Sequence, residues 1–313
     1  MIVMLPFLRT TSPPLAPLSR EDKELSSQLR RDIEVLATDI GPRGVFAPER
    51  YKIAEQFLES ALKRAGYAVV RKTFDYLEVE CCNLEAALPG TITPERILVV
   101  GAHYDSVEGC PAANDNASGV AGVLAAARAL AGRRFRSTVR FVLFANEEPP
   151  HFNINAMGSQ IYAYECHKKK EDIRGMICLE TIGCYSSTPD SQIWPLEALR
   201  LVLPNTGNFI GIVGIEQSRR FIEACADAFE RRQSFPMVAG AAPSSIEQAS
   251  WSDHRGFNEA GYQALMVTDT APLRYQHYHR STDTPDKLDY ESMARVVRGI
   301  IGSIEELADR EDL

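Results

Sequence analysis

Short apolar runs alternate with helical patterns along most of the chain. Five runs predict buried strands: Ile97–Val100, Thr138–Ala145, Arg174–Leu179, Phe209–Gly214 and Gln263–Thr268. Between them, the spacing of apolar residues predicts helices over 117–131, 157–168 and 215–231. Strands that alternate with helices predict an α/β fold, with a doubly wound, mostly parallel central sheet flanked by helices.

The remaining segments follow other patterns. Residues 1–20 contain Pro and Ser, and they predict an extended arm ahead of one domain over 21–313. Apolar spacing predicts further helices over 25–36, 48–65 and 286–307. Residues 67–88, rich in Val, Phe and Tyr, predict an antiparallel pair of strands, whereas the more polar stretches 184–208 and 236–250 predict long loops.

Composition and charge narrow the classes of function. The chain has 313 residues, 45% of them hydrophobic, and a net charge of −8, which favours neither nucleic acid nor an anionic membrane as a partner. No apolar run approaches the roughly 20 residues that span a bilayer. The first residues lack the basic start and cleavage site of a signal peptide, and the seven cysteines show no metal or disulfide spacing. We therefore expect a cytoplasmic protein.

Metal-ligand side chains follow several of the predicted strands. His103 and Asp105 come after the first strand, Glu147 and Glu148 after the second, and Glu180 ends the third. Because parallel strands end at one edge of a sheet, these groups can converge there. Carboxylates and imidazoles in this ratio suit Zn²⁺, with Mn²⁺ or Co²⁺ as substitutes.

The adjacent pair Glu147-Glu148 supports this interpretation. Two neighbouring carboxylates repel each other unless a cation or a proton lies between them. One can bind metal while the other acts as a general base on water. A solvated acidic turn is the alternative, but the pair directly follows a buried-strand pattern.

Seven segments together resemble the co-catalytic di-zinc aminopeptidases, which share a fold with glutaminyl cyclases and the transferrin-receptor ectodomain. They occur in that family's order: GAHYDS at 101–106, NDNASG at 114–119, FANEE at 144–148, MGS at 157–159, LETIG at 179–183, SDH at 252–254 and YHRSTDTPDKL at 278–288. Each segment alone is weakly specific. Their order and their places at strand ends make the resemblance specific.

The resemblance implies a set of metal ligands. One Zn²⁺ would be bound by His103 and Glu180, and the other by Glu148 and His279. Asp115 would bridge the two ions. Glu180 stands where the family commonly has Asp, which bears on how the second metal or a substrate amine is held.

The resemblance also implies roles for three other side chains. Glu147 would be the general base, and Asp105 would fix the tautomer of the His103 imidazole. Tyr278 would donate its hydroxyl to the developing oxyanion, although a packed aromatic residue is an equally good interpretation. An insertion after Glu148, PPHFNINAM, is expected to border the substrate pocket.

The other histidines have weaker claims. His279 carries the family match, so we rank it above its neighbour His277. His254 has either a place in the pocket or a structural hydrogen bond. His151 is not expected to bind metal, and His167, beside three lysines, is expected at the surface.

These expectations define an aminopeptidase that hydrolyses peptides with a free N-terminus through two metal ions and Glu147. Two alternatives stay open: a single-zinc acyltransferase like the glutaminyl cyclases, or a non-catalytic receptor-like protein of the same fold. Two, one or no zinc ions per chain would separate the three. The preferred N-terminal residue and the oligomeric state are left undetermined.

Overall fold

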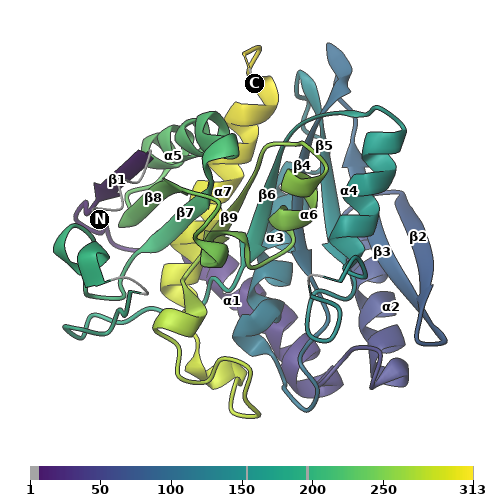
Figure 1. Cartoon of the computed structure of the whole chain (residues 1–313), viewed down its shortest axis with the longest axis horizontal. Helices are drawn as coiled ribbons and strands as arrows, with labels where there is room; N and C mark the ends of the chain where they lie inside the picture. Colours follow the sequence, from purple (N-terminus) through teal and green to yellow (C-terminus); the bar gives the residue numbers. More distant parts are fainter. Residues whose placement is uncertain (1–6, 153, 195–196, 313) are drawn as a thin grey trace.

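One large sheet runs through the protein. The structure, a computed structural model, describes residues 7–152, 154–194 and 197–312. Its nine strands lie in the order β1-β8-β7-β9-β6-β4-β5-β3-β2 (Figure 1). Their bounds are β1 Phe7–Thr11, β2 Val69–Tyr76, β3 Val79–Leu88, β4 Thr93–His103, β5 Ser137–Phe144, β6 Asp172–Glu180, β7 Ile210–Ile215, β8 Met237–Ala242 and β9 Ala264–Thr268.

The centre of this sheet is parallel. Strands β5, β4, β6 and β9 run in the same direction, and β7 is parallel to β8. Antiparallel pairs join β1 to β8, β7 to β9, β3 to β5 and β2 to β3. The four central strands therefore end at one edge of the sheet, and the side chains that follow them meet there. The expected α/β fold with a central sheet and flanking helices is confirmed.

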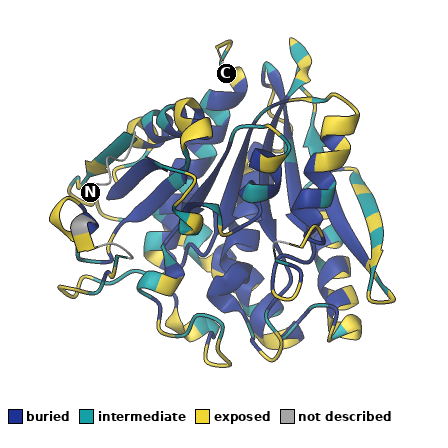
Figure 2. Ribbon diagram, viewed as in Figure 1, coloured by how far each residue is buried: buried dark blue, intermediate teal, exposed yellow. Residues whose placement is uncertain are grey.

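Helices cover both faces of the sheet unequally (Figure 2). The first face packs, through one continuous apolar core, against α1 Arg20–Glu34, α2 Pro48–Arg64, α3 Gly119–Leu130, α5 Arg219–Arg232 and α7 Tyr290–Asp309. The second face packs against α4 Gly158–Lys168 and α6 His254–Glu259 over β4, β5, β6 and the start of β9, and α4 also contacts β3. Over β7 and β8 the second face meets Trp194, Leu199, Leu203 and Phe209, which lie between β6 and β7 in the sequence. Among the described residues, every helix is too short or too polar to span a bilayer.

Two segments differ from the sequence-based expectation. The predicted loop over 236–250 is wrong for Met237–Ala242, which form β8 between β1 and β7. Residues 7–11 of the expected arm are extended, but they form the edge strand β1 of the same sheet. Both strands arise from pairing with neighbours, because β8 (MVAGAA) has little of the β-branched or aromatic character that marks a strand in sequence.

Candidate metal centre

The end of β4 places the first ligand-type side chain. β4 pairs on both sides, with β5 and β6, and His103 is its last residue. The imidazole is fully buried, and its Nδ1 lies 3.4 Å from Oδ1 of Asp105. Neither ring nitrogen of His103 has a hydrogen-bond partner among the described residues. A buried imidazole in that condition needs a partner that the protein itself does not supply.

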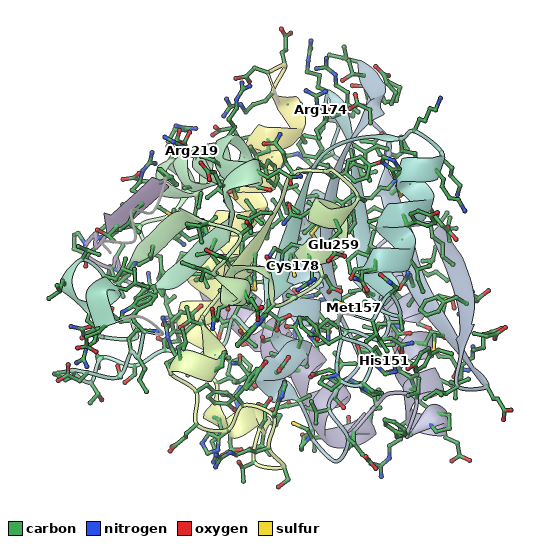
Figure 3. The ribbon with its side chains drawn as sticks, viewed as in Figure 1. His151, Met157, Arg174, Cys178, Arg219 and Glu259 are labelled. Atoms are coloured by element: carbon green, nitrogen blue, oxygen red, sulfur yellow. The ribbon has the colours of Figure 1, made fainter. Side chains whose placement is uncertain are left out.

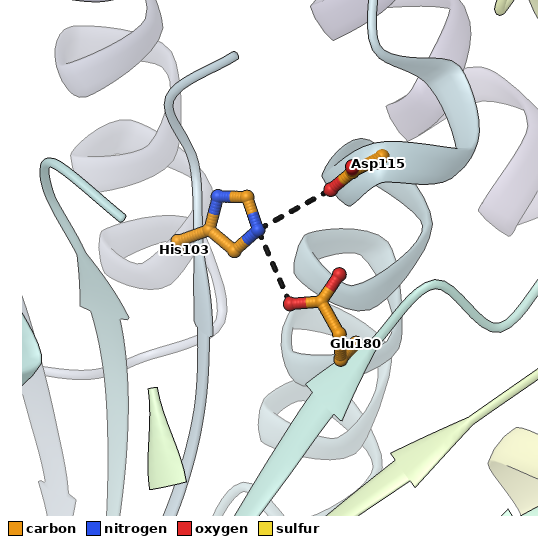
Figure 4. A group of neighbouring side chains, drawn as sticks. All are labelled: His103, Asp115 and Glu180. Carbon is orange, nitrogen blue, oxygen red and sulfur yellow. Dashed lines mark ion pairs between the residues drawn. The ribbon is translucent and has the colours of Figure 1, made fainter. Parts of the chain in front are cut away.

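His103, Asp115 and Glu180 form a first group of ligand atoms (Figure 4). Nε2 of His103 lies 3.4 Å from Oδ1 of Asp115 and 3.2 Å from Oε2 of Glu180. Glu180 is the last residue of β6, the strand next to β4. Ser252 donates its hydroxyl to the same Glu180 oxygen over 2.6 Å, which orients the carboxylate.

Asp115, Glu148 and His279 form a second group. Nε2 of His279 lies 3.1 Å from Oδ2 of Asp115 and 3.2 Å from Oε2 of Glu148. Asp115 thus faces the first group with one carboxylate oxygen and the second group with the other. The structure brings together all five side chains that the sequence singled out as metal ligands.

Two features hold Asp115 in this shared position. The carboxylate of Asp283 accepts hydrogen bonds from the backbone N–H groups of Asn114 and Asp115, over 2.9 and 3.1 Å. Just beyond, α3 begins at Gly119 so close to β6 that a Cβ there would lie 2.2 Å from the carbonyl oxygen of Leu179. Only glycine permits that approach, which brings the start of α3 against the strand that carries Glu180.

The turn after β5 directs the two glutamates. Asn146 has a φ of 57°, a left-handed conformation that Asn tolerates better than most residues. The backbone N–H groups of Glu147 and Glu148 then donate to Oδ1 and Oδ2 of Asp105, each over 3.0 Å. Asp105 therefore holds both glutamates as well as contacting His103. Oε2 of Glu147 lies 3.8 Å from Nε2 of His103, so Glu147 borders the first group while Glu148 belongs to the second.

The two adjacent glutamates of this cluster resist ionisation. Burial opposes ionisation of Asp115 as well, but its contacts with His103 and His279 lower its pKa below the ordinary value. Burial raises the pKa of Glu148 to about 8, and the neighbouring Asp115 adds to the effect. Burial also raises the pKa of Glu147 well above its ordinary value, with further contributions from Glu148 and Glu180. So many buried carboxylates favour a bound cation or bound protons.

The raised pKa values of the two imidazoles favour their charged form, unlike those of the glutamates, which favour the neutral form. Burial lowers the pKa of His103, but the charges of Glu180 and Glu147 more than offset it, so the net pKa is well above the ordinary value. Burial likewise lowers the pKa of His279, yet Asp115 and Glu148 raise it to about 10. A divalent cation could replace the positive charge that these imidazoles carry when protonated.

Tyr278 lies flat against His279. The two ring centroids are 3.8 Å apart with an interplanar angle of 17°. Burial keeps the pKa of Tyr278 far above its ordinary value, so the hydroxyl stays protonated and can donate a hydrogen bond. Tyr278 is thus a packed aromatic side chain, and its hydroxyl is available as a donor.

The remaining histidines lie outside the two groups. His277 contacts the hydroxyl of Thr282 through Nδ1, and Nε2 of His254 contacts the carbonyl oxygen of Ala249 over 2.8 Å. His254 thus has the structural hydrogen bond that was one of its two expected roles. His151 contacts the carbonyl oxygen of Glu148 through Nδ1, on a loop far from Arg219 of α5 (Figure 3). His167 is exposed, as expected.

Sequence analysis missed two supporting side chains. Asp283 and Ser252 both lie within the segments that carried the resemblance, YHRSTDTPDKL and SDH. Neither received a role, because their partners Asp115 and Glu180 are distant in sequence. The signal that could have identified both residues is that each is a polar residue inside a segment that matches the family.

Comparison with known proteins identifies relatives along most of the chain. The Escherichia coli K12 protein YfbL, described as uncharacterized, is 30% identical over 309 residues and covers 96% of this chain and 94% of its own length. Leucine aminopeptidase 1 of Arthroderma otae is 25% identical over 271 residues, 81% of this chain and 66% of that protein.

Solved structures share the fold at lower identity. The zinc aminopeptidase BSAP of Bacillus subtilis superposes with a TM-score of 0.74 at 14% identity, over 91% of this chain and 95% of its own. The glutaminyl cyclase of Fimbriiglobus ruber gives a TM-score of 0.65 at 20% identity, over 95% and 99%. Aminopeptidases and cyclases therefore share this fold, and the fold alone does not choose between them.

The family model described as Peptidase family M28 matches residues 83–304, which include every residue of both groups. The chain therefore belongs to peptidase family M28.

Proposed function

We propose that this protein is a metallo-aminopeptidase that binds two Zn²⁺ ions and hydrolyses the first peptide bond of substrates with a free N-terminus. The observation that carries the proposal is the pair of ligand groups that share Asp115. The donor set fits the metal: within the described part of the chain, Oε1 of Glu148 and Nε2 of His279 are buried without hydrogen-bond partners, as are both nitrogens of His103. Mixed carboxylate and imidazole donors suit Zn²⁺.

The two groups define which residues would hold the ions. His103 and Glu180 would hold one ion, Glu148 and His279 the other, and Asp115 both. When bound, the ions supply Lewis acidity that polarises the scissile carbonyl and acidifies water.

The chain's own residues supply the proton transfer. Glu147 accepts the proton of the attacking water at a carboxylate oxygen and delivers it to the nitrogen of the leaving amine. Burial raises the pKa of Glu147 above its ordinary value, which is the direction that makes a carboxylate a stronger base. Asp105 acts as a positioning residue, since it holds the Glu147 backbone N–H.

Two further side chains are suited to contact the substrate, one at the developing oxyanion and one at the α-amine. Tyr278 and Glu147 line one cleft. The raised pKa of Tyr278 keeps its hydroxyl protonated, so it can donate a hydrogen bond to the developing oxyanion. Glu180 borders the same cleft and offers a carboxylate to the positively charged α-amine. A free amine, held in this way, would restrict the reaction to the N-terminal peptide bond.

The second candidate function is a glutaminyl-cyclase-like acyl transfer on an N-terminal glutamine. The likeness to the Fimbriiglobus ruber cyclase in fold is what favours it. Hydrolysis is the better proposal because the second group is complete in Asp115, Glu148 and His279. A receptor-like role without catalysis would leave the retained ligands and Glu147 without a purpose.

One substrate comparison tests the proposal. Purified, zinc-loaded protein is incubated with a peptide, its N-acetylated form and a peptide that begins with glutamine, and the products are identified by mass. We expect release of the first residue from the free peptide only. Equal cleavage of the acetylated peptide would refute exopeptidase action, and loss of ammonia without chain cleavage would establish the cyclase alternative.

A further inference from the structure

A cleft of about 1140 Å³, including its open mouth, starts at the two ligand groups and crosses the second face of the sheet. Glu147, Glu180 and Tyr278 border its near end, and Leu8 and Val238 border its far end. This is the part of the second face that neither α4 nor α6 covers. The cleft is therefore continuous with the proposed reaction centre.

Small residues keep the floor of the cleft low. Alternate residues of a strand face the same side of a sheet, and the ones that face the cleft are Val238, Gly240 and Ala242 on β8 and Gly211 and Val213 on β7. Their neighbours Met237 and Ala239 belong to the core on the first face. Glycine and alanine at these cleft-facing positions leave space that larger side chains would fill.

The edge strand β1 closes the far end. Leu8 pairs directly with Gly240, and a Cβ at position 240 would lie 3.8 Å from Cδ1 of Leu8. The side chain of Leu8 thus lies over the glycine. On the other face of β1, Arg9 forms an ion pair with Asp227 of α5, which holds the strand in place.

The walls of the cleft are apolar and partly aromatic. Trp194 stacks on Phe209 with ring centroids 5.9 Å apart and an interplanar angle of 9°, and Leu199 and Leu203 pack beside them. Among the described residues that line the cleft, the charged ones are Asp115, Glu147 and Glu180, all at the metal end. A charged side chain would find no partner in the rest of the cleft.

The length of the cleft exceeds a leucine side chain. From Glu180 on β6 the cleft passes over β9 and β7 to β8, which is three strand spacings. At about 4.8 Å per spacing, that distance is roughly 14 Å. An aromatic side chain would use more of this apolar space than leucine or alanine can.

We propose that this cleft binds the side chain of the substrate's N-terminal residue and selects a bulky apolar side chain, with aromatic residues preferred. Leu8, which lies over Gly240, sets the upper limit on the length of the side chain that the cleft accepts. This inference rests on the proposed aminopeptidase activity. It gives the N-terminal strand β1 a part in substrate selection.

The first test compares kcat/KM for aminoacyl anilides of Trp, Phe, Leu, Ala, Lys and Asp on the zinc-loaded protein. Because one methylene in an apolar pocket changes kcat/KM by about 10-fold or more, the aromatic substrates should exceed Ala by at least about 10-fold. Lys and Asp should be poorer than Ala. Preference for Ala or for a charged residue would overturn this inference and leave the aminopeptidase proposal intact, whereas no hydrolysis of any free-amine substrate would remove both.

The second test alters the far end. Gly240→Val should lower the Trp-to-Ala ratio of kcat/KM by about 10-fold, and adding Leu8→Ala should restore it, because the valine then occupies the vacated space. Leu15→Ala, a truncation of an exposed leucine of the N-terminal segment, should leave the ratio unchanged. If Gly240→Val does not fold, Leu8→Ala alone should raise kcat/KM for a biphenylalanyl anilide relative to Phe. Unchanged ratios in folded variants with full zinc content would overturn the role of this wall.

Discussion

The two ligand groups share Asp115 but are built differently. The first group takes His103 and Glu180 from the ends of two adjacent strands, and the His103 side chain is 1% exposed. The second takes Glu148 and His279 from loops, and the His279 side chain is 32% exposed. Strand ends and the hydrogen bond from Ser252 position the first group, whereas the second depends on hydrogen bonds and ring stacking within loops. We therefore expect a metal ion to leave the second group faster than the first.

The largest effect on catalysis should come from Glu147, which lies beside the first group but belongs to neither group. Glu147→Gln keeps the shape but cannot accept a proton, so kcat should fall by about 10²–10⁴-fold while both metals stay bound. Steady-state rates and elemental analysis on one sample measure both quantities. Glu165→Gln, at an exposed position of α4, is the matched control and should change neither.

Two outcomes would revise the role of Glu147. Loss of a metal in Glu147→Gln, with both retained in Glu148→Gln, would exchange the roles of the two residues. Near-full activity of metal-loaded Glu147→Gln would end the general-base mechanism.

The second prediction separates the groups directly. Glu148→Gln should weaken zinc binding by more than about 100-fold at one site only, because a ligand contributes more than the 10–100-fold of an outer partner. Glu180→Gln should weaken the other site. Competition with a chelator of known affinity measures both sites in each variant. Loss of both metals in both variants would mean that the groups do not bind independently.

The third prediction concerns the residue that positions Asp115. Asp283→Asn replaces a carboxylate that accepts two backbone N–H groups, so zinc affinity should fall by about 10–100-fold at both sites. Asp286→Asn, exposed on the same loop, is the control and should have no effect on affinity. Wild-type affinity in Asp283→Asn would show that Asp115 needs no such support.

The smallest effect is the pH dependence of stability. In the metal-free protein the pKa of Glu148 rises from 4.5 to about 8 and that of His279 from 6.5 to about 10. Groups with raised native pKa values stabilise the fold below their unfolded pKa and lose that contribution as pH rises through the native value. The metal-free protein should therefore lose stability between about pH 5 and 10, whereas zinc binds the deprotonated ligands. Melting curves should show a zinc-dependent increase in Tm that grows with pH, and a constant increase would contradict this linkage.

The sequence predicted the parts of this protein that depend on local pattern. The central strands carry continuous apolar runs, and the ligand-type residues follow them, so both could be recognised. β8 could not, because its small residues become a strand through pairing with β1 and β7. The contact of Asp283 with the Asp115 backbone was equally hidden, since it joins positions 168 residues apart.

The central claim is that Asp115 bridges two metal ions, and the zinc content of the protein tests it most directly. Protein reconstituted with excess zinc and freed of unbound metal should contain two zinc ions per chain by elemental analysis, and Glu148→Gln should contain one. One ion per chain in the wild-type protein, or two in Glu148→Gln, would contradict the account.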